Sequence, residues 1–99
     1  MAGVVAAGHL TLHLPMSHSL KDKRQVLRSL QSRIRDTFGV SIAETGAQDR
    51  WQLAELTIAC AASDATHAQA TLEKIADFVE GFHLPVEIVA ADSELLYFK

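Results

Sequence analysis

The 99-residue sequence predicts one α+β domain with strands and helices in the order βαββαβ. Three observations predict it. Two segments, Ser19–Phe38 and Asp64–Phe82, repeat apolar residues at helical spacing, and four shorter segments have the composition or alternation of strands. Glycine and proline stand where these segments end. Because 48% of the residues are hydrophobic, the chain can build a core of its own.

The first strand is expected from Val4 to Leu14, where residues with even numbers form one apolar face. Pro15 ends it and keeps Leu14 extended. The helix that follows begins at Ser19, a natural N-cap, which Asp22 supports as a variant capping box. Gly39 supplies the stop. At 100° per residue, an arc of about 80° holds the stripe expected to face the core: Leu20, Leu27, Leu30, Ile34 and Phe38.

The second strand is predicted over Val40–Thr45, followed by a hairpin connection through residues 46–50. The third strand, Leu53–Ala62, alternates so that Leu56, Ile58 and Cys60 point inward. Ser63 or Asp64 is expected to cap the second helix. Its predicted core stripe is Ala65, Ala68, Leu72, Ile75, Val79 and Phe82.

The fourth strand is predicted over Val86–Ala91, with Val86, Ile88 and Ala90 facing the core. The tail, residues 92–99, is apolar enough that we expect it to extend the sheet or to form an interface.

Two interleaved right-handed crossovers in this order give a ferredoxin-like sandwich, a four-stranded antiparallel sheet with both helices on one face. The opposite sheet face should then be open. A small, moderately polar face of this kind more often forms a homodimer interface than a catalytic surface. Its predicted residues are His9, Thr11, His13, Ser41, Ala43, Glu55, Thr57, Ala59, Ala61, Glu87 and Val89.

Positive charge is concentrated on the first helix, although the formal net charge is −3. Six of the nine lysines and arginines lie between Lys21 and Arg35, and the second half of the chain is acidic. Four of them share an arc of about 60° beside the apolar stripe and form a ridge: Lys21, Arg24, Arg28 and Arg35. The ridge is either a solvated helix flank or a binding surface for a polyanion such as nucleic acid, with Lys23 at its end.

The topology should bring the ends of the first two strands to the N-terminus of the first helix. The residues expected at this edge, most of them polar, are His13, Ser17, His18, Ser19, Lys21, Lys23, Arg24, Glu44 and the hairpin residues Gln48, Asp49, Arg50 and Trp51. Lys23 falls inside the apolar stripe and Glu44 has inward parity, which predicts an ion pair between them. The alternative is a site for an anionic group at the helix N-terminus. Trp51 is expected to be a local core residue, although an exposed indole would indicate stacking.

No catalytic residue, metal site or cofactor is predicted. His9 and His13 lie about 13 Å apart on a strand, too far for one ion to join them. The sequence contains no Gly-rich phosphate loop. A single Cys60 in an apolar run suggests a reduced compartment, and no stretch has the length of a membrane helix, so we expect a cytoplasmic protein without membrane association.

Several short motifs resemble the YlxP-like family of small bacterial proteins, a domain of unknown function. They are His13-Leu14-Pro15, Ser19-Leu20-Lys21-Asp22-Lys23-Arg24, Val40-Ser41-Ile42-Ala43-Glu44 and Gln48-Asp49-Arg50-Trp51-Gln52. The resemblance covers about Val4 to Glu80, and Gly39 departs from it where the family often has asparagine.

This resemblance implies a ferredoxin-like fold. It also implies a role around ribosomal RNA or the small ribosomal subunit, because members are often encoded near translation-initiation and ribosome-maturation factors. It supplies no catalytic residues. We therefore expect a non-enzymatic RNA- or ribosome-associated module that uses the ridge. The alternatives are a homodimeric interaction module that uses the open sheet face or the tail, and an enzyme or small-ligand binder at the His13–His18–Glu44–Asp49 edge.

Overall fold

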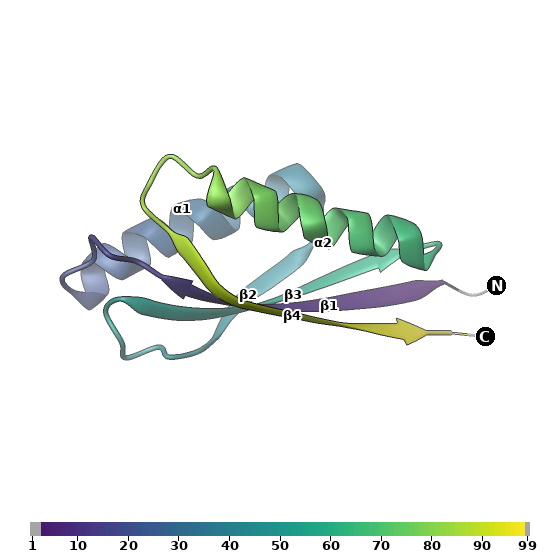
Figure 1. Ribbon diagram of the computed structural model, residues 1–99, viewed down its shortest axis with the longest axis horizontal. Coiled ribbons are helices and arrows are strands. Elements are labelled where there is room, and N and C mark those ends of the chain that lie inside the picture. Colours follow the sequence, from purple (N-terminus) through teal and green to yellow (C-terminus); the bar gives the residue numbers. More distant parts are fainter. Residues whose placement is uncertain (1–2, 99) are drawn as a thin grey trace.

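The computed structural model describes residues 3–98 and has six elements in the predicted order (Figure 1). The sheet order is β2-β3-β1-β4, and each neighbouring pair is antiparallel. The ferredoxin-like α+β prediction is therefore confirmed. The elements are β1 (Val4–His13), α1 (Leu20–Phe38), β2 (Ser41–Gly46), β3 (Leu53–Ala62), α2 (Ala65–Glu80) and β4 (Glu87–Tyr97).

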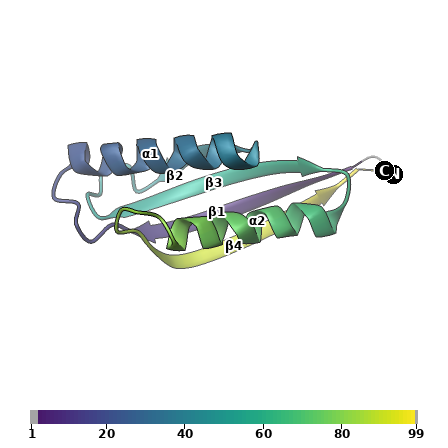
Figure 2. The ribbon, with the colours of Figure 1, turned by 90° about the horizontal axis from the view of Figure 1, so that it is seen from above.

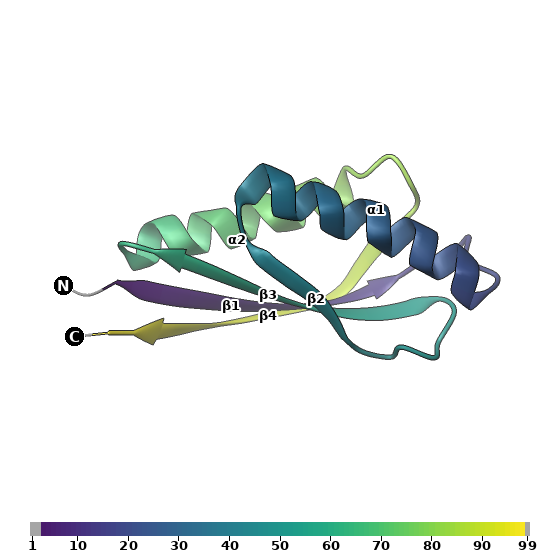
Figure 3. The same ribbon diagram turned by 180° about the vertical axis from the view of Figure 1, so that it is seen from behind.

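Both helices lie on one face of the sheet and run side by side in opposite directions (Figure 2). The domain is elongated, with principal extents of 48 × 23 × 19 Å. The β1–α1 loop and the β2–β3 hairpin lie at one end, whereas the start of β1 and the end of β4 lie together at the other (Figure 3), where the amide of Phe98 donates to the carbonyl of Gly3. The predicted polar edge is the hairpin end.

The core fills the space between the sheet and the two helices. Leu30 and Ile34 of α1 and Ile75 and Val79 of α2 are completely buried. They face alternate residues of the central strands, such as Leu12 and the β3 side chains that were predicted to point inward. Full burial of each large aliphatic side chain contributes about 1.5–3 kcal/mol relative to exposure. This layer is the main source of stability.

α1 begins and ends where its sequence predicts. Ser19 Oγ accepts a hydrogen bond from the Asp22 amide at 3.0 Å, whereas Asp22 accepts from the amide of His18 instead of Ser19. Gly39 closes the helix in the left-handed conformation, with φ of 64°, and its N–H donates to the carbonyl of Arg35. Its 19 residues are amphipathic, and no helix within residues 3–98 is long and apolar enough to cross a membrane.

β4 confirms one sequence expectation and corrects another. The strand runs past Ala91 to Tyr97 and pairs with β1 as far as Val4, so most of the tail extends the sheet, which is one of the two roles expected of it. A bulge leaves Val89 without a β1 partner, and it shifts the alternation that follows. Ala90 consequently lies opposite Thr11 on the open face, where the period predicted a core residue.

The helices leave the other sheet face uncovered in the part of the chain that the structure describes (Figure 1). Polar side chains pair across the strands on this face. His9 Nε2 lies 3.3 Å from Glu55 Oε1, and the hydroxyls of Thr45 and Thr57 share a hydrogen bond of 2.6 Å. The register confirms the predicted outward residues of β1 and β3.

Candidate nucleic-acid interface

The basic ridge of α1 borders a groove that runs between this helix and β2. The groove has a volume of about 280 Å³ and is open to solvent. Arg24, Arg28 and Arg35 line it, and all three are exposed. Successive turns of one helix place them on one side because residues three, four and seven apart share a face. The structure therefore brings three of the four predicted ridge residues together, and Lys21 lies outside the groove lining although it is exposed.

The remaining lining residues are Leu27, Gln31 and Glu44. The sequence interpretation missed Gln31, but its signal was present, because residue 31 falls within about 20° of Arg24 on the helical wheel. Arg35 reaches across the groove, and its guanidinium donates to the carbonyl of Ile42 at 3.4 Å. The site therefore combines guanidinium donors with an amide and a carboxylate, and Leu27 adds apolar surface to its lining.

Lys23 does not belong to this surface, contrary to its placement at the end of the ridge. Its side chain is buried, at 1% exposure, because residue 23 lies in the apolar stripe. The ammonium instead forms the predicted ion pair with Glu44 Oε2 at 2.8 Å and donates to the carbonyl of Ala47 at 2.7 Å. The pair joins the first turn of α1 to the β2–β3 hairpin. It also compensates the one carboxylate in the groove, so the arginine charge there is left largely unopposed.

The β2–β3 hairpin carries the other predicted edge residues. Gln48 donates to the carbonyl of Glu44, and Asp49 is exposed without forming part of the groove. Trp51 is 55% exposed, so the expectation of a local core residue is wrong. The core beside this connection is already occupied by Leu14, which is 1% exposed and whose amide donates to the carbonyl of Gln52.

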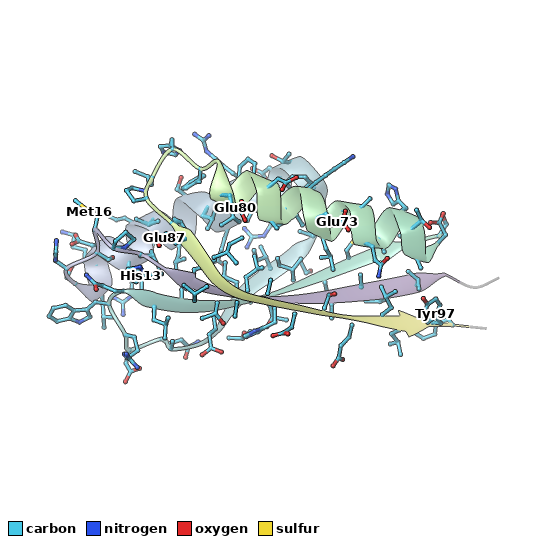
Figure 4. All side chains as sticks on the ribbon, viewed as in Figure 1. His13, Met16, Glu73, Glu80, Glu87 and Tyr97 are labelled. Atoms are coloured by element: carbon cyan, nitrogen blue, oxygen red, sulfur yellow. The ribbon has the colours of Figure 1, made fainter. Side chains whose placement is uncertain are left out.

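Two further members of the edge cluster have structural partners. Ser19 caps α1. His13 lies on the open face, where its Nδ1 is 3.5 Å from Glu87 Oε1, and Figure 4 shows both residues at the hairpin end, near Met16. Within residues 3–98, no group of three or more His, Cys, Asp or Glu side chains is arranged to hold a metal ion.

Comparison with known proteins identifies the family of this chain. Residues 5–93 match the family described as "Protein of unknown function (DUF503)". The chain is similar to the uncharacterized protein YlxP of Bacillus subtilis (strain 168), with 38% identity over 64 residues that cover 65% of this chain and 70% of that protein. The chain belongs to the DUF503 family, which confirms the YlxP-like resemblance of its sequence.

Proposed function

We propose that this protein is a non-enzymatic RNA-binding module, and that the α1–β2 groove contacts the phosphate backbone. One observation carries the proposal: three exposed arginines, Arg24, Arg28 and Arg35, line a single open groove. Arginine presents a planar fork of donors that matches phosphate oxygens. Arg24 and Arg28 are one helical turn apart, about 6 Å along the axis, so they can serve neighbouring positions on one strand.

The charge distribution supports a local site. The whole chain has a formal charge of −3, which disfavours indiscriminate coating of nucleic acid. Acidic residues are gathered on the α2 and β4 side, where Figure 4 labels Glu73, Glu80 and Glu87. A polyanion is therefore attracted to one edge of the domain and repelled from the other. Ribosomal RNA is the RNA that the family resemblance implies, with the small ribosomal subunit as its natural context.

The test is binding to small ribosomal subunits and their RNA across a salt series. We expect the unmodified protein to bind with an affinity that falls steeply as salt rises. Arg24→Glu/Arg28→Glu should weaken binding strongly at low salt and reduce the slope of log affinity against log salt by roughly one for each arginine lost. Both side chains are exposed, so the variant should fold normally, which far-UV circular dichroism checks.

The matched control is Arg33→Glu/Lys74→Glu. It makes the same charge change, but Arg33 lies on α1 outside the groove and Lys74 lies on α2. Both residues are exposed. This control should retain most of the binding and most of the salt slope. If both double variants lose the same amount of RNA affinity, the loss comes from the change in net charge and not from the groove. If the unmodified protein shows no salt-dependent binding, the proposal is refuted.

A homodimer is the second candidate function, and the exposed apolar residues of β4 favour it. Val89, Leu96 and Tyr97 are each more than half exposed, and β4 is an edge strand whose outer side has no partner strand in the described sheet. Leu95–Tyr97 pair with Val4–Ala6 of β1, so deletion of the tail would damage the fold. Val89→Ser/Leu96→Ser is the better variant. This function is supported if the unmodified protein has the molar mass of a dimer in solution and the variant has that of a monomer. It is excluded if the unmodified protein is itself a monomer.

A further inference from the structure

Trp51 is a large aromatic side chain that the fold leaves in solvent. It is 55% exposed on the connection between β2 and β3. Together with Asp49, Arg50 and Gln52 it lines an open hollow of about 360 Å³ at the hairpin end. A tryptophan carries an apolar surface of roughly 150–250 Å², and its burial would normally stabilise a domain of this size. The exposed indole adds little to this core and is available to a partner.

Hydrogen bonds fix the chain on both sides of Trp51. Before it, the carbonyl of Ala47 accepts from the Lys23 ammonium at 2.7 Å and from the amide of Arg50 at 3.0 Å. Ala47 itself has a positive φ of 56°, a conformation that alanine adopts at a cost and that these bonds hold in place. This turn is therefore anchored on a buried ion pair.

After Trp51, the neighbouring residue anchors the chain again. The carbonyl of Gln52 accepts from the amide of Leu14 at 2.9 Å. Its side-chain amide donates to the carbonyls of Pro15 and Ser17. The indole consequently extends from a supported turn, so little chain entropy is lost when a ligand packs on it.

The turn also connects Trp51 to the arginine groove. Lys23, which holds the carbonyl of Ala47, is followed in α1 by Arg24, the first arginine of the groove. Glu44, the partner of Lys23, lines the same groove. The aromatic surface and the guanidinium groups are thus anchored to one buried ion pair. Proteins that bind single-stranded nucleic acid combine these two elements, since bases stack on aromatic rings while cationic side chains follow the backbone.

We propose that Trp51 is a stacking platform for an unpaired base of single-stranded RNA whose backbone continues along Arg24 and Arg28. This inference rests on the proposed function and narrows it from RNA in general to unpaired segments such as loops and ends. The central strands present no phenylalanine, tyrosine or tryptophan on the open sheet face. The imidazoles of His9 and His13 lie 3.3 Å and 3.5 Å from glutamate carboxylates, which repel a phosphate backbone, so the proposal does not use this face. Arg50 and Asp49 are both exposed beside the indole, so these two residues together add no net charge there.

Trp51 is the single tryptophan of the chain, so its own fluorescence reports the stacking directly. The probe is a fluorescein-labelled oligouridylate of about twelve nucleotides, the length that one small domain covers, compared with a fully paired RNA hairpin. Anisotropy measures binding and indole fluorescence measures stacking. We expect the oligouridylate to quench the indole, and the paired hairpin to bind with much less quenching.

Trp51→Ala should weaken oligouridylate binding about tenfold while the salt slope stays unchanged, since stacking releases no counterions. Trp51→Phe should recover most of the affinity, because a phenyl ring still stacks. Thermal unfolding of both variants should match the unmodified protein, given the exposure of the indole.

The outcomes separate the two proposals. If Arg24→Glu/Arg28→Glu loses RNA but Trp51→Ala binds as the unmodified protein does, the stacking platform is refuted and the phosphate groove stands. Stacking is also refuted if anisotropy shows that the oligouridylate binds but the indole fluorescence is not quenched. If the unmodified protein binds neither RNA, both proposals fall. A change of indole fluorescence caused by ribosomal proteins without RNA would assign Trp51 to a protein contact instead.

Discussion

The two helices cover the same face of the sheet, α1 beside β2 and α2 over β1, β3 and β4, and they differ most in the charges that they expose. Each starts at a side-chain N-cap, Ser19 for α1 and Asp64 for α2, and each ends at a glycine. Each buries one aliphatic stripe against the same sheet face. Yet α1 carries six basic and two acidic residues, whereas α2 carries one basic and three acidic residues.

This difference distinguishes the buried residues that hold the fold together from the exposed charges that are available for binding. The buried stripes explain why both helices pack, and they do so without reference to charge. The exposed charges are therefore not required by the fold, apart from the groups that make specific contacts. Among the basic residues of α1, Lys23 makes such a contact and Arg24 and Arg28 have no ion-pair partner within residues 3–98. Matched substitutions on the two helices test this distinction.

The largest expected effect is at the buried ion pair of α1. Lys23→Met keeps the length and the apolar stem but removes the ammonium that faces Glu44. Removal of one partner from a buried pair commonly costs about 3–5 kcal/mol, and we expect the lower end because the Glu44 side chain is 22% exposed and can be partly hydrated. Urea unfolding followed by circular dichroism measures the change in the free energy of unfolding.

The matched control on the other helix is Lys74→Met. Lys74 is exposed, and no ion pair involves it within residues 3–98, so its replacement should change stability by less than about 0.5 kcal/mol. The double variant Lys23→Met/Glu44→Leu should recover most of the loss, because it leaves no unpaired charge. A single variant as stable as the unmodified protein would show that the hairpin is not anchored by this pair.

The ion pair also shows how far sequence alone predicts a site. Lys23 in an apolar stripe and Glu44 with inward parity are two local violations of the hydrophobic pattern, and each explains the other. Sequence alone also predicted the ends of α1 at Ser19 and Gly39. Such predictions are reliable because a helix cap depends on residues only a few positions apart in the chain.

The features that the sequence did not predict depend on contacts between distant parts of the chain. The bulge in β4 arises from the pairing of this strand with β1, so the alternation of apolar residues around Val89 does not reveal the bulge. The same alternation therefore predicted Ala90 on the core face, whereas it lies on the open face. The exposure of Trp51 depends on which other side chains close the core, which a hairpin sequence does not reveal. The groove was not predicted as a cavity for the same reason, since β2 supplies one of its walls.

The two N-caps give a smaller effect that should be similar in both helices. Ser19 Oγ accepts from the amide of Asp22 at 3.0 Å, and Asp64 Oδ1 accepts from the amide of His67 at 2.8 Å. Ser19→Ala and Asp64→Ala should each lower the free energy of unfolding by about 1 kcal/mol. Asp64→Asn, which keeps the acceptor and removes the charge, should retain most of that stability. A loss confined to one helix would contradict the equivalence of their starts.

The C-terminal glycines should respond in opposite directions. A methyl group at either position lowers the entropy of the unfolded chain and thereby stabilises the fold by about 0.4–1 kcal/mol. At Gly81, with φ of −93°, the new Cβ makes ordinary contact with the carbonyl of Asp77 at 3.5 Å, so Gly81→Ala should raise the melting temperature slightly. At Gly39 the Cβ meets no described atom within 4 Å, but φ of 64° places alanine in the left-handed region at a cost of about 1–2 kcal/mol. Gly39→Ala should therefore lower the melting temperature, and a rise in both variants would show that α1 ends without the left-handed residue.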